Sequence, residues 1–251
     1  MNSLYANIIN ESQKIFLKRK NVVLLILSAI ITIGTALIVS TVHKGLGIYA
    51  IRPVDFPIYM LGFFTKVLLP LFIFMWASDI FAGEIAERNL KIVLVRPITR
   101  FKVFVSKNMA IGCALIIILA IVFLFSSICS IFLGAAGKEL FKGLAYAAEA
   151  YIVAIIPMIS LVAAVSFVAQ FFKNSSGALT TSIILYIVLI LLPAGFPQAS
   201  TILVTSYTNW HVLWLGSTVS IAKLIYAFLI MLSYCLIFFS AGFYLFDARD
   251  L

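Results

Sequence analysis

Six long apolar runs, separated by short polar segments, are the main pattern of the chain. They cover residues 21–42, 57–78, 108–133, 144–172, 178–192 and 219–246. A helix that crosses a membrane needs about 20 mainly apolar residues, and backbone groups in lipid must be bonded within helices or closed barrels. Continuous apolar runs, rather than short alternating segments, exclude a barrel. We therefore predict an all-α polytopic membrane protein, with six transmembrane helices in one domain that spans residues 1–251.

Residues 1–20 carry an amphipathic pattern instead. Apolar side chains recur there at roughly helical spacing, among polar ones that include Glu11, Lys14, Lys18 and Arg19. This pattern predicts a helix that lies in the membrane interface. The alternative is a disordered tail.

The segment 193–218 matches neither a span nor an open loop. We expect Pro193 to end the fifth span, because proline donates no backbone hydrogen bond. Residues 201–216 are half apolar and include Trp210 and Trp214, so they are too short and polar to span but too apolar for open solvent. We predict a re-entrant or interfacial hairpin on the outer side of the membrane.

Composition and charge support this class and give an orientation. The chain is 64% hydrophobic and 11% charged, with a mean hydropathy of +1.17, whereas soluble chains are about 45–50% apolar and about 25% charged. Its basic residues gather in the polar segments, about two to one on the side that would carry both termini. This bias predicts that both termini lie in the cytoplasm, and it accounts for the net charge of +9 without a nucleic-acid partner.

The most densely charged segment is 79–107, between the second and third spans. Two acid-before-base pairs, each four residues apart, favour a short helix within it: Glu84 with Arg88, and Glu87 with Lys91. Pro97 should end that helix, and Thr99 can cap the next one. We predict a cytoplasmic coupling segment on which a soluble partner can act.

This segment resembles the corresponding loop of ABC-2-type transporter permeases, in which a Glu is followed by Gly-Thr-Leu, a Leu, Pro-Ile-Ser-Arg and a Lys. The matching positions are Glu84, Leu90, Leu94, Pro97, Ile98, Arg100 and Lys107. The chain departs from the pattern at Arg88-Asn89, where the family has Gly-Thr, so no tight turn is carried over to these positions. The layout of spans, leading helix and late hairpin is also similar to that family.

The resemblance implies a permease subunit in a bacterial plasma membrane, one that is not itself an enzyme. It would pair with a second permease, identical or different, and bind two copies of a nucleotide-binding ATPase subunit that holds the ATP and Mg²⁺. We expect no cofactor in this chain, since its nearest approach to a phosphate-binding GxxxxGK[ST] motif, residues 134–139, has the wrong spacing. The expected ATPase-docking residues are Glu84, Glu87, Arg88, Lys91 and Arg100; the alternative is that these charges are solvated and only fix the topology.

The cargo is suggested by the resemblance alone. Permeases of this layout in Gram-positive bacteria resemble exporters of amphipathic peptides such as bacitracin, lantibiotics and phenol-soluble modulins, while others move drugs, lipids or sodium. We expect an amphipathic or hydrophobic peptide, or a drug. Two alternative functions stay open, an ion-coupled carrier and an intramembrane enzyme.

Lys66 is the charge placed deepest in a predicted span. It follows Pro57 by nine residues, or about 13 Å along a helix, and a charge at such depth costs about 2.5–3.5 kcal/mol. Lys66 can extend toward the outer surface, pair with Glu149, or line a wet cavity on the substrate path. His43 and His211 lack metal-ligand spacing, so we expect no metal site.

Overall fold

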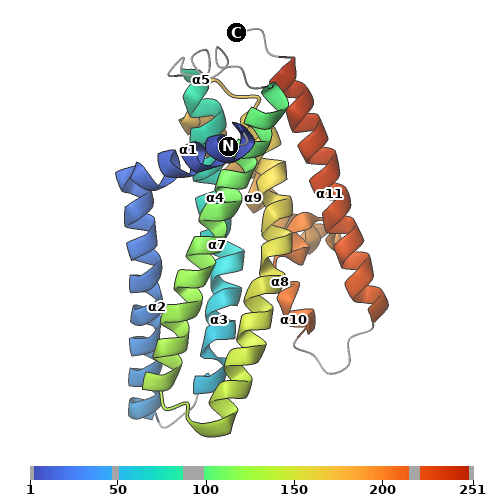
Figure 1. Cartoon of the computed structure of the whole chain (residues 1–251). Coiled ribbons are helices and arrows are strands. Elements are labelled where there is room, and N and C mark those ends of the chain that lie inside the picture. Colours follow the sequence, from blue (N-terminus) through green and yellow to red (C-terminus); the bar gives the residue numbers. More distant parts are fainter. Residues whose placement is uncertain (1–2, 47–50, 87–98, 215–220, 249–251) are drawn as a thin grey trace.

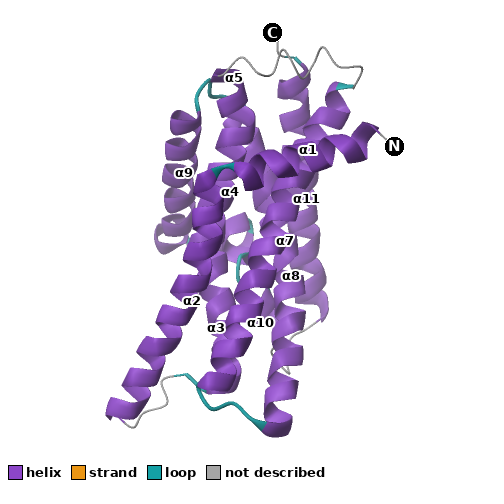
Figure 2. Ribbon diagram, turned by 60° about the vertical axis from the view of Figure 1, so that its left-hand side comes forward, coloured by secondary structure: helices purple, strands orange, loops and turns teal. Residues whose placement is uncertain are grey.

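The protein is a bundle of helices with one further helix lying across its end (Figures 1 and 2). The computed structural model describes residues 3–46, 51–86, 99–214 and 221–248, and every regular element in these ranges is helical. Figure 1 shows α1 (Ser3–Leu17), α5 (Glu84–Ala86) and the C-terminus at the same end of the bundle. We call this the terminus-bearing end, and the other the opposite end.

The predicted all-α fold is confirmed for the described residues, in which six helical stretches are long and apolar enough to cross a membrane. Four are single helices: α7 (Arg100–Phe132), α8 (Gly137–Ala169), α9 (Ser175–Gly195) and α11 (Ile221–Asp247). The first corresponds to α2 (Arg19–Leu46). The second is a series of short pieces: η1 (Pro53–Asp55), α3 (Phe56–Phe63), η2 (Phe64–Leu68), α4 (Leu69–Ala77) and η3 (Ser78–Gly83).

The interior of the bundle is formed by the second span, α7 and α8. In the most apolar window of α8, 61% of the residues are buried, against 17% in α2 and 11% in α11. Both α7 and α8 contain 33 residues, so each is about 50 Å long and exceeds a hydrocarbon layer of about 30 Å. These helices therefore extend past the apolar layer, which is why both begin earlier than the sequence pattern predicts.

The second span contains two π-helical turns, and the first has an identifiable cause. Pro70 has no backbone N–H, so the carbonyl of Lys66 loses the donor four residues ahead of it. The chain inserts the wider turn η2 at this point, and the Leu69 amide bonds back to the carbonyl of Phe64. The hydroxyl of Tyr186, on α9, donates to the Lys66 carbonyl at 2.8 Å. Pro70 thereby creates a link between two spans.

Pro193 produces a second link of the same kind, and here the sequence prediction is wrong. The fifth span does not end before Pro193, because α9 continues to Gly195. The carbonyl that Pro193 leaves without its helical donor belongs to Leu189, and the Thr205 hydroxyl donates to it at 3.3 Å. A proline is accommodated within α9 because a neighbouring segment supplies the missing donor.

That neighbouring segment lies within the predicted 193–218 hairpin. It consists of short helices, η4 (Pro197–Thr201), η5 (Val204–Tyr207) and α10 (His211–Trp214), which Figure 1 shows between α8 and α11. The side chains of Val204, Trp210 and His211 are buried. The last residues of the predicted hairpin, 215–218, lie outside the described residues.

At the opposite end the chain turns tightly between α7 and α8. Gly134 and Gly137 have φ angles of 104° and 68°, a left-handed conformation that suits glycine. Nearby, a Cβ on Gly143 would lie 2.1 Å from Cγ1 of Val54. Glycine at position 143 therefore allows the η1 turn to lie directly against α8.

Candidate functional site

Helix α1 presents a polar stripe to the bundle and an apolar stripe outward. Asn7, Glu11 and Ile15, which follow one another at intervals of four residues, are at most 4% exposed. Tyr5 and Leu17, on the outward stripe, are 59% and 81% exposed. The amphipathic helix predicted for residues 1–20 is present, but the bundle covers its polar stripe.

The covered stripe meets a buried network of four charges. Nζ of Lys107, a fully buried residue of α7, lies 2.5 Å from Oε2 of Glu84 and 3.2 Å from Oε2 of Glu11. Nζ of Lys14 lies 2.6 Å from Oε1 of Glu11 and 3.0 Å from Oε1 of Glu84. Two ammonium groups thus alternate with two carboxylates, and the network is neutral. It joins α1, the end of the second span and α7.

Two members of this charge network, Glu84 and Lys14, have pKa values that are shifted from their ordinary ranges. Burial disfavours the charged form of Glu84, but the ammonium groups of Lys107 and Lys14 outweigh burial, so the pKa of Glu84 is lowered. Burial likewise acts against Lys14, yet its contacts with Glu11 and Glu84 prevail and its pKa is raised. Glu84 and Lys14 therefore stay charged around neutral pH.

Further polar contacts fix α1 along its length. Asn7 donates to the Ser106 hydroxyl of α7 at 2.5 Å. Near the corner between α1 and α2, Asn21 donates to the Ile15 carbonyl at 2.5 Å and accepts from the indole N–H of Trp76 at 3.2 Å.

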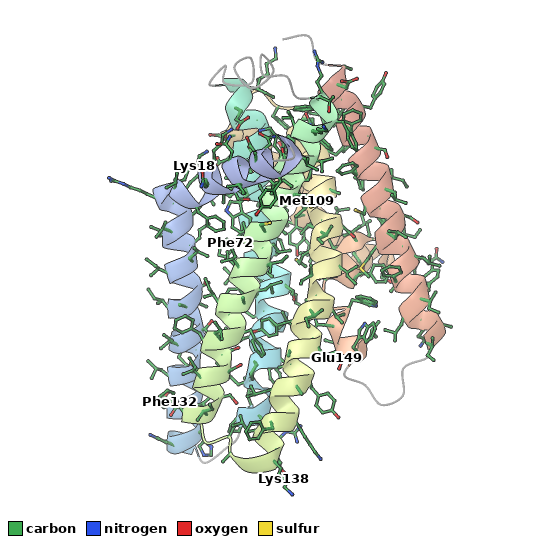
Figure 3. The ribbon with its side chains drawn as sticks, viewed as in Figure 1. Lys18, Phe72, Met109, Phe132, Lys138 and Glu149 are labelled. Carbon is green, nitrogen blue, oxygen red and sulfur yellow. The ribbon has the colours of Figure 1, made fainter. Side chains whose placement is uncertain are left out.

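Asp79 adds a second ionic contact at this corner. Its carboxylate pairs with Lys18 at 3.7 Å and with Lys20. Figure 3 shows Lys18 where α1 meets α2. Helix α1 and the start of α2 are thus attached to the last turns of the second span at two places, near Asp79 and near Glu84.

The residues predicted to dock an ATPase have different placements. Glu84 is only 8% exposed, with its carboxylate turned toward Lys107. Arg100, at the start of α7, donates to the backbone carbonyl of Asp247 at the end of α11. The other three, Glu87, Arg88 and Lys91, lie outside the described residues, as does most of the predicted coupling helix. The predicted cap of α7 is confirmed, since the Thr99 side chain accepts from the Lys102 amide.

The two residues predicted for the substrate path are not brought together. Lys66 and Glu149 are both exposed, and no ion pair joins them in the part of the chain that the structure describes. Figure 3 shows Glu149 on α8. Lys66 instead lines a cavity of about 580 Å³ between the second span and α10. Of the three alternatives for Lys66, the pair with Glu149 is not formed within the described ranges.

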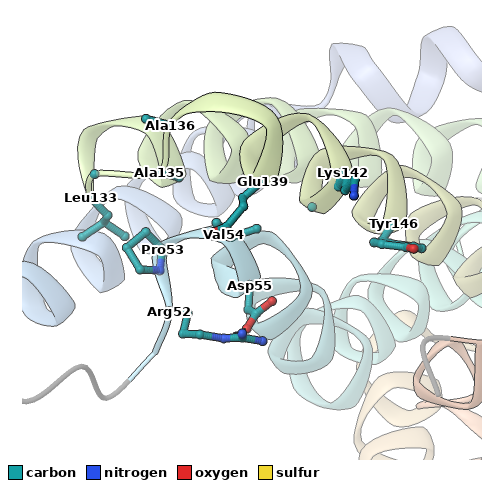
Figure 4. A pocket seen from close by; sticks show the side chains of 12 residues that line it. Arg52, Pro53, Val54, Asp55, Leu133, Ala135, Ala136, Glu139, Lys142 and Tyr146 are labelled. Atoms are coloured by element: carbon teal, nitrogen blue, oxygen red, sulfur yellow. Dashed lines mark hydrogen bonds and ion pairs between the residues drawn. The ribbon is translucent and has the colours of Figure 1, made fainter. Parts of the chain in front are cut away.

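Other cavities include one within the bundle and one at its opposite end. One, of about 350 Å³, is lined almost entirely by apolar side chains of α4, α8, α9, α11 and the 203–205 segment. The other, of about 870 Å³, opens at the opposite end between the η1 turn and the start of α8. Figure 4 shows Arg52 beside Asp55 there, at 2.8 Å, with Glu139 and Lys142 on α8.

Sequence reasoning did not find the partners of Glu84. Glu11 and Lys107 are 96 positions apart, so no local pattern joins them. Two weak signals of the network are present in the sequence. Glu11 and Lys14 are three residues apart, and Lys107 lies seven residues inside a helix that begins at Arg100. A lysine buried in an apolar helix requires an acidic partner.

Comparison with known proteins gives the family. The family model described as ABC-2 family transporter protein matches residues 7–192, about three quarters of the chain. That range begins in α1 and includes all four members of the charge network. No curated protein matches the chain. Because the family model covers well over half of its length, this multi-pass membrane protein belongs to the ABC-2 family of transporter proteins.

Proposed function

We propose that the chain is the permease subunit of an ATP-driven exporter in a bacterial plasma membrane, with both termini in the cytoplasm. The observation that carries the proposal is the charge network of Glu11, Lys14, Glu84 and Lys107, at the end where the 87–98 segment connects the second and third spans. The chain lacks a phosphate-binding motif, so the energy comes from a separate ATPase subunit, which binds ATP and Mg²⁺.

In this proposal the ATPase docks on residues 79–107. Glu87, Arg88 and Lys91 provide the charged contact, and Arg100 supports it from the start of α7. Glu84 belongs to the same segment but is turned inward, so its part is to connect the docking surface to Lys107 and to α1. A push on the segment would then move the second span, α7 and α1 together, because buried ion pairs resist separation.

The exposed stripe of α1 suits this role. Tyr5, Ile9 and Leu17 are exposed on the side away from the bundle, so they can rest among lipid acyl chains at the cytoplasmic interface. Helix α1 would thus anchor the moving end of the bundle to the membrane surface.

The cargo we propose is an amphipathic or hydrophobic peptide, with a hydrophobic drug as the other member of the same class. Six helices enclose too little space for such a molecule to pass, so we propose that two permeases, identical or different, form the path with two ATPase subunits. The exposed apolar faces of α2, α9 and α11 leave room for contact with a second permease.

Co-purification tests this function. The tagged chain, extracted in mild detergent from its own cells, should bring along a soluble ATPase in a stoichiometric amount. Arg88→Glu should remove that ATPase, because it reverses a charge of the docking surface. Lys142→Glu, which makes the same charge change on α8 at the opposite end, should not.

Two results would count against the proposal. Equal recovery of the ATPase with Arg88→Glu would remove the 79–107 segment from the contact. Transport or catalysis by the purified chain without any ATPase would favour an ion-coupled carrier or an intramembrane enzyme.

A further inference from the structure

The cavity beside Lys66 combines apolar walls with polar groups that converge from two elements. It has a volume of about 580 Å³, within the range of about 300–1,000 Å³ of small-molecule sites. Ile58, Phe63 and Val212 provide apolar surface. Tyr59 and Lys66 come from the second span, and Asn209 and His211 come from the segment after η5.

The lining of this cavity carries one carboxylate, that of Asp55, and one ammonium group, that of Lys66. Asp55, on its rim, is already paired with Arg52 at 2.8 Å. Lys66 makes no ion pair or side-chain hydrogen bond within the described ranges, since only its backbone carbonyl is used, by Tyr186. One ammonium group therefore stands in the cavity without a counter-charge from those residues.

His211 is the least expected member of the set. It is fully buried, and neither Nδ1 nor Nε2 has a hydrogen-bond partner in the described part of the chain. Burial, together with the nearby charge of Lys66, lowers the pKa of His211 to about 4. The ring is therefore neutral at physiological pH and can donate one N–H. Leaving a buried polar group without a partner is costly, and a ligand that bonds the ring would remove that cost.

Asn209 lies beside the second span. Its Oδ1 is 3.5 Å from the Thr65 hydroxyl, which donates to the Leu61 carbonyl at 2.9 Å. The NH₂ group of Asn209 has no hydrogen-bond partner within the described ranges, so it is left to serve a ligand. Lys66, His211 and Asn209 together offer donors, and all three line the same cavity.

We propose that this cavity binds an amphiphile with a single anionic head group, whose charge meets Lys66 and whose head group accepts hydrogen bonds from His211 and Asn209. The aliphatic part lies against Phe63 and Val212. A free carboxylate amphiphile and an anionic lipid share this chemistry. The inference concerns binding alone, so it does not depend on ATP-driven export.

The test uses the full chain in nanodiscs of neutral phosphatidylcholine, without ATPase. Trp210 and Trp214 flank His211 and lie 5.5 Å apart between ring centroids, so they report on this region. The probe is 11-bromoundecanoate in mildly alkaline buffer, because bromine quenches tryptophan fluorescence at short range. The matched uncharged probe is 11-bromoundecanol. We expect saturable quenching by the carboxylate at a concentration about tenfold lower than by the alcohol, the difference that a charge-assisted hydrogen bond provides.

Variants identify the groups responsible. Lys66→Met should abolish the preference for the carboxylate, and Lys66→Arg should keep it. Lys142→Met, which removes a lysine that lines the cavity at the opposite end but not the one beside Lys66, should leave it unchanged. His211→Leu should weaken carboxylate binding several-fold without lowering the melting temperature, because it removes an unpartnered buried polar group. A merely structural histidine would instead lower the melting temperature and leave the preference intact.

These measurements test the proposal and distinguish an anionic lipid from a free amphiphile as the ligand. A carboxylate preference that Lys66→Met removes supports the site. If nanodiscs containing phosphatidylglycerol then block the carboxylate, the lipid head group is a second occupant of the same site; if they do not, the site selects free amphiphiles. Equal quenching by acid and alcohol, or a preference that survives Lys66→Met, overturns the proposal.

Discussion

Lys107 has no exposed surface, although it belongs to a helix apolar enough to cross a membrane. A buried ammonium group is tolerated only when carboxylates and hydrogen bonds replace its water. Here Glu84 and Glu11 do so, and the Ile80 carbonyl lies 3.5 Å from Nζ. The network contains as many ammonium groups as carboxylates, since Lys14 offsets the second carboxylate.

The balance between ammonium groups and carboxylates predicts how much stability substitutions in the network remove. Lys107→Met leaves two carboxylates against one lysine and should destabilise the protein by about 3–5 kcal/mol. Adding Glu84→Met to Lys107→Met leaves the neutral pair of Glu11 and Lys14, so the double variant should regain a large part of that loss. Chemical unfolding in detergent measures both. Losses that simply add would show that the four charges do not act as a network.

Lys142→Met is the control for these measurements. Lys142 is exposed at the opposite end, and substitutions at such sites usually change stability by less than about 0.5 kcal/mol.

The pH dependence of stability follows from the same residues. The lowered pKa of Glu84 contributes stability above its unfolded pKa of about 4.3, and that contribution is lost as the pH falls through the folded value. The raised pKa of Lys14 contributes stability below its unfolded pKa of about 10.4, and that contribution is lost as the pH rises through the folded value. Melting temperatures should therefore change little between about pH 5 and pH 10 on account of Glu84 and Lys14. Glu84→Gln should flatten the acid limb, and an unchanged acid limb would contradict the assignment.

At the scale of elements, two prolines within spans tie helices together. Pro70 frees the carbonyl of Lys66 for Tyr186, and Pro193 frees that of Leu189 for Thr205. Each proline removes a bond within its own helix and leaves an acceptor for a neighbour. In lipid, where water cannot supply the missing donor, such an acceptor needs a protein partner.

A double-mutant cycle tests the first of these links. Tyr186→Phe removes the donor and should cost about 1 kcal/mol. Pro70→Ala restores a backbone N–H four residues after Lys66, so the same change should cost less in that background. Unfolding of the four proteins in detergent gives the coupling. An equal cost in both backgrounds would mean that the Lys66 carbonyl is not what Tyr186 satisfies.

The elements themselves were largely predictable, but their partners were not. Apolar runs predicted six spans, because length and hydropathy are local properties, and Thr99 predicted a cap three residues before Lys102. The continuation of α9 through Pro193 was not predictable, since it depends on the hydroxyl of Thr205, twelve positions later in the chain. The face that α1 turns inward also escaped prediction. Periodicity shows that a helix has two faces, but not which one a bundle covers.

For the whole molecule, the two candidate sites lie in different regions. The charge network is at the terminus-bearing end, with α1 and the end of the second span. The Lys66 cavity is within the second span and against α10. The second span belongs to both and carries a π-helical turn near each, η2 at Lys66 and η3 before Glu84. A movement begun at Glu84 would therefore pass along the same span that lines the cavity.

In the assembly that we propose, a separate ATPase subunit binds the segment between the second and third spans. The most direct measurement is photo-cross-linking in the intact, ATP-hydrolysing assembly, with a benzophenone side chain at Asn89 or, for comparison, at Lys138, which Figure 3 shows at the opposite end. We expect a covalent adduct with the ATPase from position 89 and none from position 138. No adduct from position 89 in an active assembly, or an adduct from position 138, would contradict it.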